Sequence, residues 1–92
     1  MRATRSLPVF ALLVLLAAAC SPQLPDADST GAHLYVERCG VCHRVYAPGV
    51  LTAEMWKVQV ARMQEMMERR GVRPLDTREQ ETILSYLTTH SG

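Results

Sequence analysis

The chain has 92 residues, of which 48% are hydrophobic and 21% are charged, a composition typical of one small globular domain. Its formal net charge is +1, which excludes the strong basic excess that marks nucleic-acid-binding proteins. The length leaves no room for a second large domain or an elaborate catalytic cleft, and the sequence contains no internal repeat. We therefore expect a single small domain whose partners are not nucleic acids.

The first 19 residues have the pattern of an export signal. A short basic region from Met1 to Arg5 precedes an apolar run over residues 7–16, and small residues end the segment at Ala19. The apolar run is shorter than the stretch of about 20 residues that a transmembrane helix needs. We therefore predict that residues 1–19 are a signal peptide and that the protein is exported to a bacterial periplasm.

Cys20 follows three alanines, an arrangement that resembles a bacterial lipobox. In a lipobox the cysteine becomes the lipidated first residue of the mature protein. Its acyl chains hold the protein at a membrane, because each buried CH₂ contributes about 0.8 kcal/mol. An ordinary signal peptide is the alternative, since Leu16 lies one position farther from the cysteine than the leucine of most lipoboxes. We predict lipidation at Cys20, followed by a flexible tether over residues 20–29.

Helical patterns begin near Thr30, and residues 30–92 contain no alternating run typical of a strand. The first helix is expected over residues 31–38, with its N-cap among residues 28–30 and with Leu34 and Tyr35 buried. This helix leads directly into Cys39. The predicted fold class is therefore all-α.

Two further helices are expected after a loop. The longer one runs from Ala53 to about Arg70, with Thr52 as its N-cap and Gly71 beyond its end. The last one starts at residue 76 or 77, where the sequence fits a capping box. Its expected core side chains are Ile83, Leu84, Tyr86 and Leu87.

The pentapeptide Cys39-Gly40-Val41-Cys42-His43 carries the chemistry of the chain. Two thiols with this spacing can each form a thioether with a haem vinyl group, and the adjacent histidine can ligate the iron. We predict one covalently attached haem c, with Cys39 and Cys42 as attachment sites and His43 as the proximal ligand. A zinc site, a redox-active dithiol and a structural disulfide remain alternatives. His33 and His90 are expected to be exposed.

From Gly31 to His90 the chain resembles the class I type small monohaem c-type cytochromes of bacteria. The resemblance depends on the haem motif, on Tyr35 before it, and on Trp56 and Tyr86-Leu87 after it. It implies three to four helices around one covalently bound haem, with the first and last helices crossing at one haem edge. It also implies that a carbonyl near Pro48 accepts a hydrogen bond from Nδ1 of His43.

The sixth iron ligand is the point at which the sequence departs from the common pattern, because the segment before the last helix contains no methionine. Trp56, Val60, Met63 and Met67 share one face of the long helix. Related haem domains place a methionine seven residues after this tryptophan, which favours Met63 as the distal ligand. Met67, a histidine, an open position and plain core packing of the methionines remain alternatives.

These features predict a periplasmic or membrane-tethered electron-transfer protein, not an enzyme, whose haem iron cycles between Fe(III) and Fe(II). Its expected partners are redox proteins in the periplasm or membrane, together with the membrane itself through the lipid at Cys20. The alternatives are a haem-based ligand sensor or small oxidoreductase with an open sixth position, and an accessory haem subunit of a larger redox complex.

Overall fold

The computed structural model describes residues 23–92, so the predicted signal peptide and the predicted lipid anchor at Cys20 lie outside the described residues. The described elements are α2 (Thr30–Cys39), the short 3₁₀ helix η2 (Pro48–Val50), α3 (Ala53–Arg69) and α4 (Thr77–Thr89). In this part of the chain every regular element is a helix, which confirms the all-α class. None of these helices is both long enough and apolar enough to cross a membrane.

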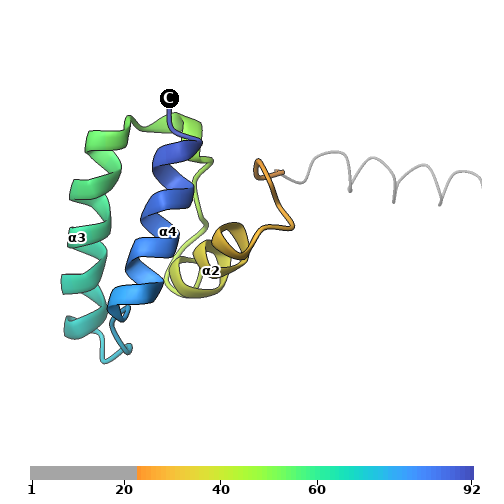
Figure 1. The fold of residues 1–92 in the computed structure, drawn as a ribbon. Helices are drawn as coiled ribbons and strands as arrows, with labels where there is room; N and C mark the ends of the chain where they lie inside the picture. The colour runs from red at the N-terminus through yellow and green to blue at the C-terminus, as the bar shows by residue number, and fades with distance from the viewer. Residues whose placement is uncertain (1–22) are drawn as a thin grey trace, which may run out of the picture.

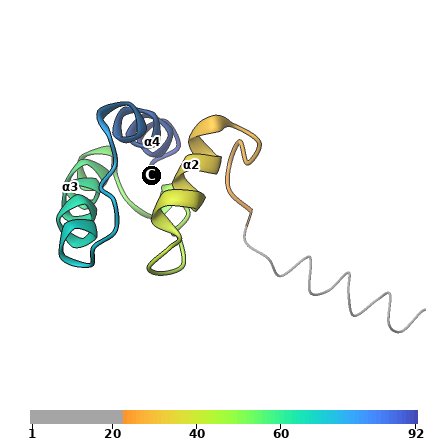
Figure 2. The same cartoon turned by 90° about the horizontal axis from the view of Figure 1, so that it is seen from below.

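Helix α4 is the centre of the arrangement, because it packs against both other long helices. Figure 1 shows α3 and α4 side by side and α2 crossing α4 at a steep angle. Seen from below, α3 and α2 lie on opposite sides of the molecule, with α4 between them along one edge (Figure 2). The crossing of the first and last helices, which the resemblance implied, is therefore present.

Local capping explains where each helix begins. The Ser29 side chain accepts a hydrogen bond from the amide of Ala32 at 3.1 Å, and Thr52 caps α3 in the same way. Asp76 and Glu79 form the predicted capping box at the start of α4. Gly71 follows the end of α3 with φ of +70°, a left-handed conformation that glycine adopts without steric cost. The predicted boundaries of α3 and α4 are thus confirmed to within one residue.

The core consists of side chains from all three long helices and from the segment before α4. The predicted stripe on α3 is buried at all four positions, and three of the four side chains predicted on α4 are buried. Leu34 and Leu84 are only half-buried, so the expectation that they belong to the centre of the core was wrong. The buried residues are Ala32, Tyr35, Cys39, Trp56, Val60, Met63, Met67, Leu75, Ile83, Tyr86 and Leu87.

The segment before α2 also contacts the fold. Leu24 packs against the core, and the Tyr86 hydroxyl donates a hydrogen bond to the Pro25 carbonyl at 2.7 Å. His90 Nε2 lies 3.1 Å from an Asp26 carboxylate oxygen, and its ring centroid is 5.0 Å from that of Tyr86. Contacts between the chain and the folded domain therefore begin before Thr30, the first residue of α2. His90 is half-buried rather than exposed, because the chain before α2 folds back over the end of α4.

The α2–α4 crossing depends on a glycine. A Cβ added at Gly31 would lie 2.6 Å from Cβ of Tyr86, a distance that real Cβ atoms do not show. We expect Gly31→Ala to lower the unfolding free energy by about 1–3 kcal/mol, because the two helices must separate to admit the methyl group. Denaturant unfolding of the protein measures this.

Gly49→Ala is the matched control, since its Cβ would meet only the His90 carbonyl oxygen, at 4.0 Å. We expect this variant to stay within about 0.5 kcal/mol of the parent. Equal stability of the Gly31→Ala variant and the parent would contradict the close crossing.

Candidate functional site

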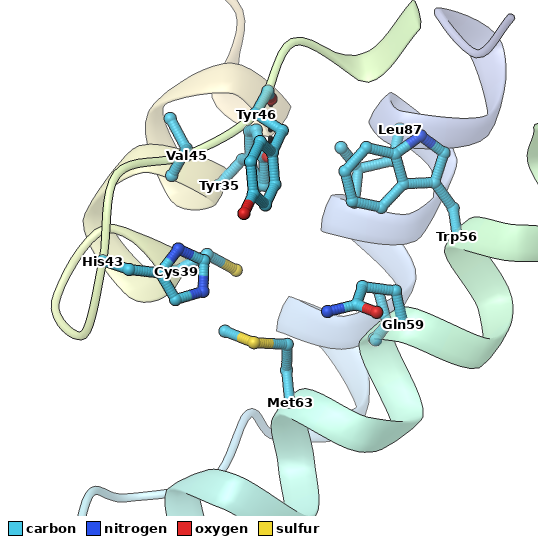
Figure 3. Close-up of a pocket in the computed structure, with 10 residues that line it drawn as sticks. Tyr35, Cys39, His43, Val45, Tyr46, Trp56, Gln59, Met63 and Leu87 are labelled. Carbon is cyan, nitrogen blue, oxygen red and sulfur yellow. Dashed lines mark hydrogen bonds between the residues drawn. The ribbon is translucent and has the colours of Figure 1, made fainter. Parts of the chain in front are cut away.

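An apolar pocket occupies the space between α2, α3 and α4. It is narrow, with a cavity volume of about 20 Å³, and its lining is almost entirely apolar. The loop after α2 closes it on the side opposite α3 (Figure 3). Its lining residues are Tyr35, Cys39, His43, Val45, Tyr46, Trp56, Gln59, Val60, Met63 and Leu87.

Two aromatic side chains form part of the wall, and their polar atoms are satisfied by the loop. The Tyr35 hydroxyl donates to the Tyr46 carbonyl at 2.6 Å, and Trp56 Nε1 donates to the Pro48 carbonyl at 2.8 Å. The two rings meet edge to face, with centroids 6.0 Å apart. Burial raises the pKa of the Tyr35 hydroxyl to about 12, so this side chain is neutral at physiological pH. The wall therefore presents ring carbon to the pocket.

The two thiols of the haem motif lie at the C-terminal end of α2. Cys39 is the last residue of the helix and is buried, whereas Cys42 lies in the following turn and is half-buried. Both are free thiols. Burial raises the pKa of the Cys39 thiol to about 11, so it is protonated at neutral pH. Between them, Gly40 is needed for the turn, since a Cβ there would collide with the Val36 carbonyl oxygen.

His43 extends from the loop toward the pocket. Its Nδ1 lies 2.8 Å from the Arg44 carbonyl oxygen. A carbonyl can only accept, so Nδ1 is the donor of this bond, which leaves Nε2 as the ring nitrogen for a metal. The resemblance implied that a carbonyl near Pro48 would accept the hydrogen bond from Nδ1 of His43. That expectation was wrong, because the Arg44 carbonyl lies at Nδ1, and the Pro48 carbonyl accepts from Trp56 Nε1.

Met63 faces His43 from the opposite wall. Its side chain projects from the middle of α3 into the pocket, toward the ring of His43 and the sulfur of Cys39 (Figure 3). Met67 is also buried, but it packs in the core and does not line this pocket. Met55 is exposed and Met66 is half-buried. Of the methionines considered from the sequence, the structure therefore brings only Met63 into the pocket lining.

The remaining sequence candidates lie elsewhere. His33 is exposed, as expected, and His90 is held by Asp26 at the end of α4. Among residues 23–92, no three His, Cys, Asp or Glu side chains come together as a metal site, so the zinc alternative finds no support. The described residues also contain no strand on which a thioredoxin-like pair would sit.

Sequence reasoning missed three residues of the pocket lining, Val45, Tyr46 and Gln59. Gln59 lies one helical turn before Met63, and its side chain is directed into the same space (Figure 3). The i, i+4 spacing on α3 was the signal that could have revealed it. Tyr46 belongs to a loop without periodicity, and its ring centroid lies 5.9 Å from that of His43. No pattern in the sequence pointed to it.

A partly buried ion-pair network fixes the end of α2 next to the motif. Arg38 Nη1 lies 2.6 Å from a Glu79 carboxylate oxygen, and the Arg38 guanidinium also donates to the Arg73 carbonyl. The side chain of Arg73 binds the same carboxylate at 3.0 Å. Because Arg38 directly precedes Cys39, the network holds the motif against the start of α4. Hydrogen bonds from Arg73 and Arg38 keep the pKa of Glu79 far below its ordinary value.

The pocket joins the Cys39 thiol, the His43 imidazole and the Met63 thioether in an apolar, helical setting, and the Cys42 thiol lies in the turn beside it. This is the donor set of a c-type cytochrome. Comparison with protein-family models agrees: residues 35–92 match the model described as dihaem cytochrome c. The chain therefore belongs to the dihaem cytochrome c family. No significant match was found among curated proteins or among solved structures.

The Glu79 network predicts a dependence of stability on acid. The pKa of Glu79 is lower in the folded chain than its ordinary value of 4.5, so its stabilising contribution is complete above that pH and disappears as the pH falls below it. We expect Glu79→Gln to lower the melting temperature at pH 7 and to weaken the loss of stability below pH 4.5. A glutamine still completes the capping box, so the cap itself is kept.

Thermal unfolding followed by circular dichroism between pH 3 and pH 7 measures both effects. Glu81→Gln is the control, because Glu81 is an exposed carboxylate on the same helix. An unchanged acid dependence in Glu79→Gln would show that the network contributes nothing to stability.

Proposed function

We propose that this protein is a periplasmic or membrane-tethered electron-transfer protein that carries one covalently attached haem c and has no enzymatic activity of its own. Membership of a cytochrome c family establishes the general class, haem-based electron transfer. The observation that carries the finer proposal is the position of His43 and Met63 on opposite walls of one apolar pocket, beside Cys39.

The haem count follows from the cysteines of the sequence. The matched family description names two haems, but the chain has three cysteines and a single C-x-x-C-H motif. Two haem groups attached through two thioethers each would need four cysteines. We therefore assign one haem to these 92 residues.

The donor set of the pocket fits this group, and the side chains around it would move apart to admit the ring, because the cavity volume is only about 20 Å³. Cys39 and Cys42 would hold it through thioether bonds, and His43 would ligate the iron through Nε2 while Nδ1 stays bonded to the Arg44 carbonyl. That second bond keeps the imidazole in one tautomer and raises its basicity. When bound, haem c supplies an iron that cycles between Fe(III) and Fe(II).

Met63 would supply the distal ligand through its sulfur. Thioether ligation raises the reduction potential relative to bis-histidine ligation, so it suits a protein that passes electrons to a terminal oxidase or another high-potential acceptor. The aromatic wall formed by Tyr35 and Trp56 keeps water from the group, because the polar atoms of both side chains bond to the loop instead. An occupied sixth position leaves no place for a substrate.

The expected location follows from the N-terminus. An export signal over residues 1–19 would deliver the chain to the periplasm, where haem c is attached, and lipid at Cys20 would keep it at a membrane surface. The partners of such a protein are redox proteins of the periplasm or membrane.

Substitution of two methionines tests the function and the ligand together. The parent protein should be low-spin in both oxidation states, and carbon monoxide should not change its reduced spectrum. Met63→Ala should open the sixth position, bind carbon monoxide and lower the potential by a substantial part of the roughly 0.8 V that axial ligands control. Visible spectroscopy and a redox titration measure these changes.

Met67→Ala is the matched control, because Met67 lies one helical turn away, is buried, and does not line the pocket. It should keep the parent spectrum while losing about 2–5 kcal/mol of stability. Carbon monoxide binding by the parent would instead indicate a ligand sensor or oxidoreductase with an open position.

Replacement of Cys20 tests the anchor. Expressed with its own leader, the parent should partition with membranes and into detergent, whereas Cys20→Ser should lack lipid and fail to mature normally. Fractionation and the mass of the N-terminal peptide measure this. A parent protein that is wholly soluble with an unmodified N-terminus would show that the leader is an ordinary signal peptide.

A further inference from the structure

The outer face of α3 carries exposed apolar side chains that the haem pocket does not use. Met55 and Val58 are 51% and 53% exposed, although both lie on an ordered helix. Helix α3 forms one edge of the molecule in Figures 1 and 2, and in the part of the chain described here no other helix covers this face. Exposed apolar groups that lie together in this way mark an interaction surface.

Charges at the two ends of this face have opposite signs. Glu54, Val58 and Arg62 are spaced four residues apart, so they form one row along the helix, with the valine at its centre. The ion pair between Glu54 and Lys57 joins two exposed side chains, 83% and 55% accessible, and such pairs contribute little. Glu54 therefore remains available to a partner.

We propose that this face is an interface between two copies of the chain, packed as antiparallel α3 helices about a two-fold axis at Val58. In such a pair, each residue faces the one equally far on the other side of Val58. Glu54 then meets the partner's Arg62, Arg62 meets the partner's Glu54, and Val58 meets its own copy. Met55 covers the partner's Ala61. The charges of the row are therefore complementary to the charges of the same row in a second copy. This self-complementarity favours a second copy of the chain over an unrelated protein as the partner.

The surface also continues toward the pocket. A shallow groove runs over this face between Met55, Val58 and Gln59, and Gln59 also lines the pocket itself. A dimer joined along α3 would therefore shield the α3 edge of both pockets. Since the row from Glu54 to Arg62 spans only about 12 Å of helix, the interface is small. We expect a concentration-dependent dimer that weakens as salt screens the charges.

Charge reversal tests this arrangement. Glu54→Arg should place like charges together twice in each dimer, and Arg62→Glu should do the same. Each single variant should therefore raise the dimer dissociation constant by about 10-fold or more. The double variant, Glu54→Arg with Arg62→Glu, should restore dimerisation. A mixture of the two single variants should form a heterodimer, because both contacts are then between opposite charges.

Sedimentation velocity of the full haem-loaded chain, in detergent if it partitions with membranes, measures association up to about 1 mM protein, the weak end of specific affinities. Glu81→Arg and Arg78→Glu are the control reversals, since both residues are exposed on α4. They should leave the dissociation constant unchanged. A parent that stays monomeric throughout, or a dimer that persists in both single variants, would overturn the proposal. Neither result affects the haem assignment, which spectroscopy tests separately.

Discussion

The close approach of α2 to α4 is the contact on which the pocket depends. It is possible because Gly31 has no side chain at the point where the backbone of α2 meets Tyr86. With the helices this close, the ring centroids of Tyr35 and Tyr86 lie 6.0 Å apart. Cys39, at the end of α2, is buried in the core. Helix α4 in turn holds α3, which brings Met63 to the facing wall.

The same contact is reinforced at both ends of α4. At its start, Glu79 joins Arg38 and Arg73 and so fixes the residue before the haem motif. Near its end, the Tyr86 hydroxyl holds the Pro25 carbonyl of the segment before α2. A domain of this size has a marginal core of its own, so an apolar group bound in the central pocket would add to the stability of the fold. Binding of such a group and the stability of the folded domain would therefore depend on each other.

Features that depend on local sequence could be predicted. The N-cap at Thr52 and the capping box at Asp76 act within one helical turn, and the stripe from Trp56 to Met67 follows from helical periodicity. These signals were enough for the helix boundaries of α3 and α4 and for the all-α class. Periodicity placed both Met63 and Met67 on this face, and the resemblance to related haem domains favoured Met63, the methionine that lines the pocket.

Features that depend on contacts between distant segments could not be predicted. The resemblance implied that a carbonyl near Pro48 would accept from His43, but Nδ1 of His43 bonds to the Arg44 carbonyl, and only the folded loop decides which carbonyl it reaches. The Arg38–Glu79 pair joins residues 41 positions apart, and burial of His90 requires the chain before α2 to fold back. Tyr46 and Gln59 become pocket residues only once the loop and α3 face each other.

The central claim is that this chain binds one haem through the thiols of Cys39 and Cys42. The most direct measurement is the intact mass of the full chain, matured in a periplasm and then denatured, before and after acid-acetone extraction. We expect the mass of the chain to exceed that of the polypeptide by one haem, both before and after extraction. We expect this extra mass to be absent when Cys39 and Cys42 are both replaced by alanine. A chain without bound haem, a haem that extraction removes, or two haems on one chain would contradict it.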